Sequence, residues 1–311
     1  MNTTAKLAAY GAALALLVGV GYVAGSAVGP RSVAAAGSGA SGASPSPAAD
    51  IVVAAAPDLP GGLASSRDGY TLTPTDPRLT PATPTEFAFR ISGPDGRPVT
   101  AFDVEHDKRM HLIVVRRDTA AYQHVHPEMG VDGTWRVALT LPAAGSYRAF
   151  ADFTPTGADA TTLGVDLVAA GAFEPVTHAA SRTALVDGYT VELTGELVPG
   201  QDSPVTLTVS KDGTPVTDLQ PYLAAYGHLV ALREGDLAYL HVHPDGTPGD
   251  GRTAAGPQIS FLAAVPSAGT YRLFLDFRHG DVVRTAEFTV PTGAAVADVA
   301  PPTGHSDGHG H

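Results

Sequence analysis

The sequence of 311 residues contains no cysteine, a single tryptophan and only three methionines. The absence of cysteine excludes disulfide bonds, thiolate metal sites, a cysteine nucleophile and a lipidated N-terminal cysteine. Together with the scarcity of methionine it disfavours a dedicated Cu(I) site. Charged residues make up only 16%, and the formal net charge is −12 without a basic run. This acidic balance argues against nucleic acid as a partner.

One long uncharged run, from Leu7 to Val28, follows Lys6. At ~1.5 Å per helical residue it is long enough to cross a hydrocarbon core of ~30 Å. A signal peptide needs only ~7–15 apolar residues in this region. The N-terminal amine and Lys6 favour a cytoplasmic N-terminus. We therefore expect a single-pass cell-membrane protein with extracytoplasmic domains. Cleavage among the small residues from Ser32 to Ala36, which would give a secreted product, is the alternative.

The segment from His111 to Pro127 returns as His228 to Pro244, at a constant offset of 117 residues. Nine of the eighteen residues that end at each proline are identical. A second pair of matched blocks begins at Leu141 and at Val265, where the offset has grown to 124. The insertion falls in the Gly- and Pro-rich stretch after Pro244, where a surface loop tolerates it. The chain is therefore predicted to be a tandem duplication of one domain.

These landmarks divide the chain into five parts. We expect a membrane anchor or signal peptide in 1–32, a flexible linker rich in Ala, Gly, Ser and Pro in 33–66, a first repeat in 67–178, a second repeat in 179–292 and a disordered histidine-rich tail in 293–311.

Both repeats contain short β-rich runs separated by turn residues, without a helical period. The runs are 86–91, 111–115, 135–141 and 147–153 in the first repeat, and 205–209, 228–232, 259–265, 271–277 and 285–290 in the second. A Pro-x-x-Gly-x-Tyr pattern that ends at Tyr147 and at Tyr271 is typical of the tyrosine corner of immunoglobulin-type sandwiches. We place both tyrosines, with Phe153 and Phe277, in the core. The predicted fold class is all-β: two tandem immunoglobulin-like antiparallel β-sandwiches after an N-terminal transmembrane helix.

Each repeat also presents a tyrosine and two histidines that are predicted to share one face of a strand, because side chains alternate across a strand. Histidines at positions i and i+2 lie ~7 Å apart along the strand, close enough to chelate one ion when their rings converge. The histidine that opens each repeat would supply the third ligand from a neighbouring strand. We expect each repeat to bind one divalent transition-metal ion, copper or zinc. The expected ligands are His111, His124 and His126 in the first repeat and His228, His241 and His243 in the second. An exposed aromatic stripe with a structural role is the other interpretation.

Asp152 and Asp276 each follow an arginine by four residues, with a phenylalanine on the same face between them. They either pair with these arginines along the strand or serve as acidic ligands or as partners that orient an imidazole. His106 has no counterpart in the second repeat, where Leu223 stands, and it is expected at the surface.

The C-terminal tail carries three histidines spaced by glycine, serine and aspartate. Short histidine-rich tracts commonly bind metal, and we expect a flexible collector of Cu(II), Ni(II) or Zn(II). Its ligands would be His305, His309 and His311.

The His-Leu start, the His-x-His-Pro strand and the tyrosine block that ends in FADF or FLDF resemble a group of uncharacterised bacterial exported sandwich proteins, some of which accompany heavy-metal handling systems. They are more distantly similar to CopC-type and YtkA-like sandwich domains. The resemblance covers about residues 67–292. Copper binding of the CopC type uses a histidine at a free mature N-terminus, a feature that is absent here, so no ligand is carried over.

We interpret the protein as an extracytoplasmic metal-binding accessory protein for copper or zinc handling. Its expected partners are the membrane through residues 7–28, a metal ion, and a metal transporter or another exported protein. A non-metal protein-interaction module at the cell surface that uses the same sheet face is one alternative, and a small zinc or copper enzyme is another. No Ser-His-Asp order, phosphate loop or His-Glu-x-x-His motif is present in the sequence, so a non-enzyme is predicted.

Retention of the hydrophobic run is testable on the protein purified from membranes. Because the run from Leu7 to Val28 is long enough to span the bilayer, the mature chain should keep it. Mass spectrometry of the intact protein should therefore give an N-terminus at Met1 or Asn2. A mature chain that begins near Ala36 would establish cleavage and secretion instead.

Overall fold

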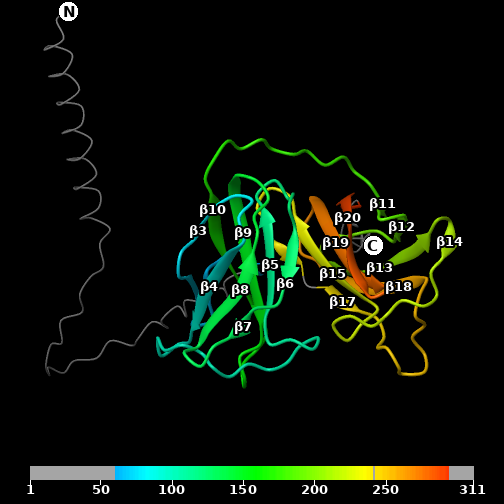
Figure 1. The fold of residues 1–311 in the computed structure, drawn as a ribbon. Coiled ribbons are helices and arrows are strands. Elements are labelled where there is room, and N and C mark those ends of the chain that lie inside the picture. Colours follow the sequence, from blue (N-terminus) through cyan, green and yellow to red (C-terminus); the bar gives the residue numbers. More distant parts are fainter. Residues whose placement is uncertain (1–59, 241, 294–311) are drawn as a thin grey trace, which may run out of the picture. The chain divides into compact units, whose positions relative to one another are not determined.

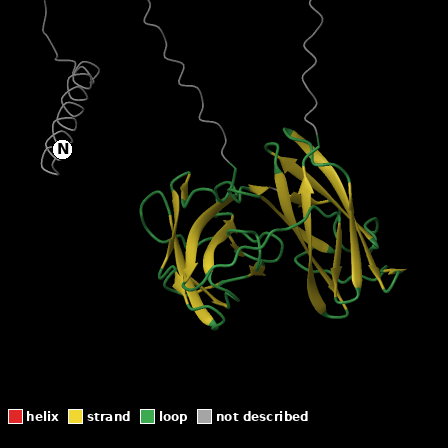
Figure 2. Cartoon of the chain, turned by 90° about the horizontal axis from the view of Figure 1, so that it is seen from above, coloured by secondary structure: helices red, strands yellow, loops and turns green. Residues whose placement is uncertain are grey.

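The computed structural model describes residues 60–240 and 242–293. Within these residues the chain consists of strands, turns and loops, without a helix (Figure 2). None of the described residues therefore belongs to a helix that could cross a membrane. The hydrophobic run from Leu7 to Val28 and the three tail histidines lie outside the described residues. The predicted all-β class is confirmed for the part of the chain that the structure describes.

The first repeat is a sandwich of two five-stranded sheets, in the orders β1-β2-β4-β8-β7 and β3-β10-β9-β5-β6 (Figure 1). Neighbouring strands are antiparallel, apart from the short parallel pair of β3 with β10. The strands are β1 (Ser66–Arg67), β2 (Tyr70–Pro74), β3 (Arg78–Leu79), β4 (Thr85–Ser92), β5 (His111–Arg116), β6 (Gln123–Val125), β7 (Glu128–Met129), β8 (Thr134–Leu139), β9 (Gly145–Phe153) and β10 (Thr161–Ala169).

The second repeat has the corresponding two sheets. One has the order β11-β12-β13-β18-β17 with β14 beside β13, and the other has the order β16-β15-β19-β20. The strands are β11 (Thr183–Val186), β12 (Tyr189–Thr194), β13 (Gln201–Lys211), β14 (Thr214–Pro215), β15 (Gly227–Arg233), β16 (Tyr239–Leu240), β17 (Val242–Pro244), β18 (Gln258–Val265), β19 (Thr270–His279) and β20 (Val282–Pro291). The inserted residues form the loop between β17 and β18, as the offset of the matched blocks predicted.

Each sandwich encloses its own hydrophobic core. The four predicted core residues are all buried there: Tyr147 and Phe153 in the first repeat, and Tyr271 and Phe277 in the second. The Tyr147 hydroxyl donates a hydrogen bond to the carbonyl of Ala143 (2.8 Å), and the Tyr271 hydroxyl donates one to the carbonyl of Ser267 (2.9 Å). These bonds return to the backbone four residues upstream, which is typical of a tyrosine corner. This element of the prediction is confirmed.

The sequence Asp-Gly-Tyr-Thr occurs near the start of each repeat, at residues 68–71 and 187–190. In both places it forms a hairpin turn. Asp68 and Gly69 have φ of 52° and 84°, and Asp187 and Gly188 have φ of 47° and 80°. Positive φ at both central residues is the requirement of a two-residue type I′ turn, which suits Asp-Gly. The motif therefore joins β1 to β2 and β11 to β12, so that each repeat begins one strand earlier than the motif.

A third hydrophobic cluster lies between the two repeats. All six residues of β5 are buried, although β5 belongs to a two-layer sandwich. Leu112 and Val114 join the core of the first repeat. The alternate residues Ile113 and Val115 instead join a cluster with β15 of the second repeat. The full set is Ile113, Val115, Phe150, Val230, Leu232, Leu237 and Phe274, with Tyr122 and Tyr239 packed against it. We call this set the inter-repeat cluster.

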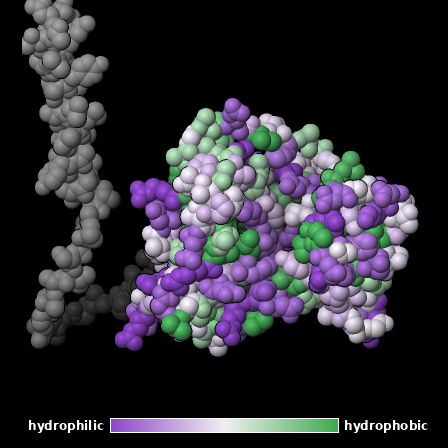
Figure 3. Space-filling view, in the orientation of Figure 1, coloured by the Kyte–Doolittle hydropathy of each residue, from purple (hydrophilic) through white to green (hydrophobic). Residues whose placement is uncertain are grey.

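Aromatic rings cross the inter-repeat cluster in both directions. Tyr122 of the first repeat stacks on Phe274 of the second, with ring centroids 4.0 Å apart and planes within 4°. Tyr239 of the second repeat contacts Phe150 of the first, with centroids 5.8 Å apart. The sheet faces predicted to carry histidines thus cover one another. By contrast, the face drawn in Figure 3 is mainly hydrophilic, with scattered hydrophobic residues.

A truncation inside the inter-repeat cluster should be as costly as one in a sandwich core. Ile113→Ala removes a side chain with 0% exposure and should lower the free energy of unfolding by about 2–5 kcal/mol. Urea titration of the purified full-length protein measures this loss. Leu185→Ala, at a residue that is 80% exposed, is the matched control and should change it by less than about 0.5 kcal/mol. Equal effects of the two substitutions would contradict the packing of the repeats.

Candidate metal centre

Three histidines meet at the edge of the inter-repeat cluster. His111 begins β5 and His124 lies in the neighbouring strand β6, both in the first repeat, whereas His228 lies in β15 of the second repeat. One ring nitrogen of each lies within 4.8 Å of the others. His111 Nδ1 and His124 Nε2 are 3.1 Å apart. The rings of His111 and His228 are stacked, with centroids 5.4 Å apart and planes within 4°.

The outer nitrogen of two of these rings is held by an acceptor. His111 Nε2 donates a hydrogen bond to the backbone carbonyl of Glu105 (3.0 Å), and His124 Nδ1 donates one to the Asp276 carboxylate (2.9 Å). A neutral imidazole has one N–H and one lone pair. With both rings neutral, the two nitrogens that face each other at 3.1 Å both carry lone pairs, whereas a proton on either nitrogen would make the contact a hydrogen bond. Metal-binding histidines almost always donate their other N–H to a carboxylate or carbonyl in this way.

Asp276 comes from β19, where it lies opposite His228 in the strand register. Its carboxylate nevertheless binds His124 of the other repeat, and it also accepts a hydrogen bond from Thr285 Oγ1 (2.6 Å). The arginine four residues before it, Arg272, pairs with Glu287 instead. Of the two interpretations offered for this aspartate, the geometry of Asp276 corresponds to a partner that orients an imidazole.

Asp152 is the counterpart of Asp276 in the first repeat. Arg148 pairs with Asp166 (3.0 Å) and donates to the backbone carbonyls of Gly62 and Leu63. Asp152 accepts a hydrogen bond from Thr162 Oγ1 (2.7 Å). An arginine–carboxylate pair along the strand is thus not formed at this position either.

Two further histidines surround the three-histidine group. The ring of His126 lies 5.0 Å from that of His111 and 4.8 Å from that of His124. The ring of His106, which was expected at the surface, is half-buried and lies 5.3 Å from that of His228. Among the described residues, no hydrogen-bond partner is found for the buried atoms His126 Nε2 and His228 Nδ1.

Burial lowers the pKa of three of these rings, those of His111, His126 and His228. Desolvation, followed by the repulsion of neighbouring histidines, lowers the pKa of His126 to about 3. Desolvation also lowers the pKa of His111 to about 4 against the opposing effect of its bond to Glu105, and it lowers the pKa of His228 well below 6.5. The neutral imidazole is the form that binds metal, so no proton has to be displaced from these three rings near neutral pH.

The structure brings the three histidines predicted for the first repeat, His111, His124 and His126, close to one another, and it adds His228 of the second repeat to this group. The reason is that Ile113 and Val230 pack β5 against β15, which brings His111 next to His228. In the second repeat, β16 pairs with β15 but β17 pairs with β18 of the other sheet. His243 is therefore carried by the other sheet, where it is exposed. His241 lies outside the described residues.

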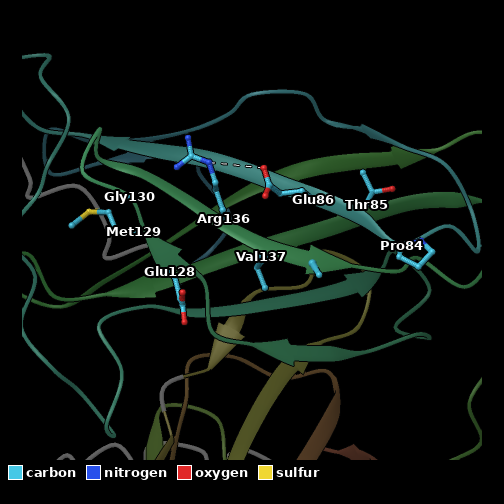
Figure 4. Close-up of a pocket in the computed structure, with 9 residues that line it drawn as sticks. Pro84, Thr85, Glu86, Glu128, Met129, Gly130, Arg136 and Val137 are labelled. Atoms are coloured by element: carbon cyan, nitrogen blue, oxygen red, sulfur yellow. Dashed lines mark ion pairs between the residues drawn. The ribbon is translucent and has the colours of Figure 1, made fainter.

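A separate hollow lies over β4, β7 and β8, on the outer sheet of the first repeat (Figure 4). Glu86 and Arg136 form an ion pair across it (3.9 Å), and Glu128 and Met129 lie at its other side. Its lining residues include no histidine. The candidate histidine ligands among the described residues thus lie between the repeats and not in this hollow.

The fold and the buried histidines define the chain as a tandem β-sandwich protein with a candidate metal centre between its repeats. The chain belongs to the family described as Domain of unknown function (DUF8832), which it matches twice, over residues 64–168 and 184–294. The family match supports the internal repeat found in the sequence. No curated protein matches the chain.

Several solved structures match the chain at low identity and with low TM-scores. Salmonella alpha-2-macroglobulin reacted with methylamine is 13% identical, with a TM-score of 0.26, over 75% of this chain and 15% of that one. The Escherichia coli adhesin FdeC is 12% identical, with a TM-score of 0.23, over 72% of this chain and 65% of that one. Invasin, a bacterial integrin-binding protein, is 14% identical, with a TM-score of 0.20, over 71% of this chain and 39% of that one. This chain thus spans only 15% of the macroglobulin's length. These similarities concern the fold alone, and none of them supports the expected likeness to CopC-type or YtkA-like domains.

The lowered pKa of His111 predicts a pH dependence of stability. In the unfolded chain this histidine titrates near 6.5, and in the folded protein it titrates at about 4. Between these values the unfolded state binds more protons, so the free energy of unfolding should fall as the pH is lowered, by up to ~1.4 kcal/mol per pH unit for this residue. Urea titrations between about pH 7 and pH 5 with a metal chelator measure the slope.

His111→Asn removes one titrating group and should reduce this slope, while His126 and His228, whose pKa values are also lowered, continue to contribute. The control is His178→Asn, because His178 bonds only the Asp118 carbonyl, away from the cluster, and this variant should keep the wild-type slope. An unchanged slope in His111→Asn would show that His111 is not buried in its neutral form.

Proposed function

We propose that the protein is a membrane-anchored, extracytoplasmic, non-enzymatic accessory protein that binds one divalent transition-metal ion, copper or zinc, between its two repeats. The ligands are His111, His124 and His228. The supporting observation is the pair of ring nitrogens of His111 and His124, 3.1 Å apart, whose outer nitrogens both donate hydrogen bonds. Facing lone pairs at this distance repel each other, and a cation between them converts the repulsion into two bonds.

The distances suit a small ion. Imidazole nitrogens bound ~2.0–2.1 Å from a tetrahedral ion lie ~3.3 Å from one another. His111 and His124 are already at 3.1 Å, and the third nitrogen lies within 4.8 Å. Binding therefore requires an inward shift of His228 by up to about 1.5 Å. Three ligands leave a fourth position for water or for a ligand of a donor protein.

The ligand types favour zinc and Cu(II). Neutral imidazoles suit Zn(II), Cu(II) and Ni(II), and the carboxylate of Asp276 behind His124 raises the basicity of the ring. The sequence contains no thiolate to compete for the ion. The tail histidines, His305, His309 and His311, would capture ions and deliver them to this centre.

A protein-interaction module at the cell surface is the second candidate function. The sheet faces first expected to dock a partner are occupied by the contacts between Tyr122 and Phe274 and between Tyr239 and Phe150. A partner would therefore bind another surface of the sandwiches. A zinc or copper enzyme is the third candidate, and turnover of a hydrolysable ester by the zinc-loaded protein would reveal it.

The test uses the full-length protein in detergent, with the three tail histidines replaced by asparagine to remove the tail as a binding site. After dialysis against zinc or copper, elemental analysis should find one bound ion per protein. His124→Gln should abolish binding of this ion, and His228→Gln should abolish it equally. The double variant should lose no more than either single variant, because both residues hold the same ion. Asp276→Asn should keep the ion but weaken its binding by about 10–100-fold.

His178→Gln, outside the cluster, is the control for an unspecific loss of histidine, and far-UV circular dichroism verifies that each variant is folded. An unchanged stoichiometry in both single variants would overturn the metal proposal and leave the interaction module. If His124→Gln and His228→Gln each lost a different ion, each repeat would have a separate site, as the sequence predicted.

A further inference from the structure

A cavity of about 320 Å³ leads from the surface to two of the three ligands. His111 and His228 line it, and its wall is built from both repeats. Lys108, Arg109 and His106 come from the loop before β5, and Val242 and His243 come from β17. His111 is only 5% exposed, so this cavity is the route from solvent to the centre that the described residues provide.

His106 stands in this route on a tight two-residue turn. His106 and Asp107 have φ of 47° and 62°. The backbone amide of each flanking residue, Glu105 and Lys108, donates to the carbonyl of the other (2.8 and 2.9 Å). Left-handed backbone is uncommon outside glycine, and histidine is among the residues that adopt it more often than most. In this turn the imidazole of His106 lies 5.3 Å from the His228 ring and 6.2 Å from the His111 ring, measured between ring centroids.

The second repeat builds the same turn without a ligand. Leu223 and Ala224 have φ of 53° and 58°, and Tyr222 and Ala225 exchange the same two backbone bonds. The conformation is thus a property of the repeated fold, whereas the imidazole is specific to the first repeat. The carbonyl of Glu105 in the first turn also accepts the hydrogen bond from His111. The turn that orients one ligand therefore carries a spare imidazole beside it.

We propose that His106 is an exchange ligand: it binds an incoming ion at the mouth of the cavity and passes it to His228 and His111, and it receives the ion again on release. This inference rests on the proposed metal-binding function. A hydrated ion that enters a buried three-histidine site directly must shed several waters at once. With His106 in the path it exchanges its ligands one at a time. The cavity is lined by charges of both signs, Lys108 and Arg109 together with Glu105 and Asp152, so its lining does not by itself exclude a cation.

The test separates rates from affinity in the full-length protein with the tail histidines replaced by asparagine. Uptake and release of zinc are followed by stopped flow against a chromophoric chelator. His106→Asn should slow both rates by about tenfold while the dissociation constant, their ratio, changes by less than about threefold. His106→Asp should restore fast exchange. Asparagine and aspartate both tolerate positive φ, so the pair keeps the turn and differs mainly in its ability to bind the ion.

Asp107→Asn is the control for the charge of the turn and should leave both rates as in the wild type. If His106→Asn exchanged zinc at the wild-type rates, the exchange role would be overturned. The proposed function would remain intact in that case, provided that the wild-type protein bound the ion. A weaker affinity with unchanged uptake would also overturn it, because His106 would then be a permanent fourth ligand. Absence of a bound ion at the three histidines in the wild-type protein would instead remove the proposed function itself.

Discussion

The burial of imidazoles between two hydrophobic sheet faces is the constraint on which the described structure depends. An unsatisfied buried polar atom costs about 1–3 kcal/mol. Glu105 and Asp276 accept the outer N–H groups of His111 and His124, but their inner nitrogens face each other. His126 Nε2 and His228 Nδ1 lack hydrogen-bond partners among the described residues. The packing of the repeats is therefore unfavourable in its polar part, and the burial of the inter-repeat cluster has to offset it.

That cluster explains why histidines of both repeats come together at one place. Each repeat presents the same hydrophobic face, and the two faces cover each other through the reciprocal pairs Tyr122 with Phe274 and Tyr239 with Phe150. A face-to-face contact of this kind brings the histidine ends of β5 and β15 together. The symmetry is then broken by single residues, such as His106 in one turn and Leu223 in the other.

The sequence predicted what depends on local pattern. Alternation along the strands placed Tyr122 and His124 on the face opposite Val125, and the structure has Val125 against the core of the first repeat and Tyr122 against the inter-repeat cluster. The contact between the repeats is a long-range property that no local pattern determines. One signal of it is present in β5, because an uninterrupted run such as HLIVVR in a sandwich strand indicates that both faces are covered. The position of His106 beside the His228 ring depends on the same contact between the repeats, and the local sequence around His106 gives no comparable signal of it.

The contacts that Asp276 and His228 make with histidines of the first repeat have an energetic consequence. Asp276 lies beside His228 in its own sheet but binds His124 of the other repeat, and His228 in turn stacks on His111. An ion held by these histidines therefore binds only the arrangement in which the repeats are packed. By linkage, a ligand at 100 times its dissociation constant stabilises such an arrangement by ~2.7 kcal/mol. Under the proposed function, metal loading would therefore stabilise the packing of the two sandwiches against each other, since the ion would join His111 and His124 of one repeat to His228 of the other.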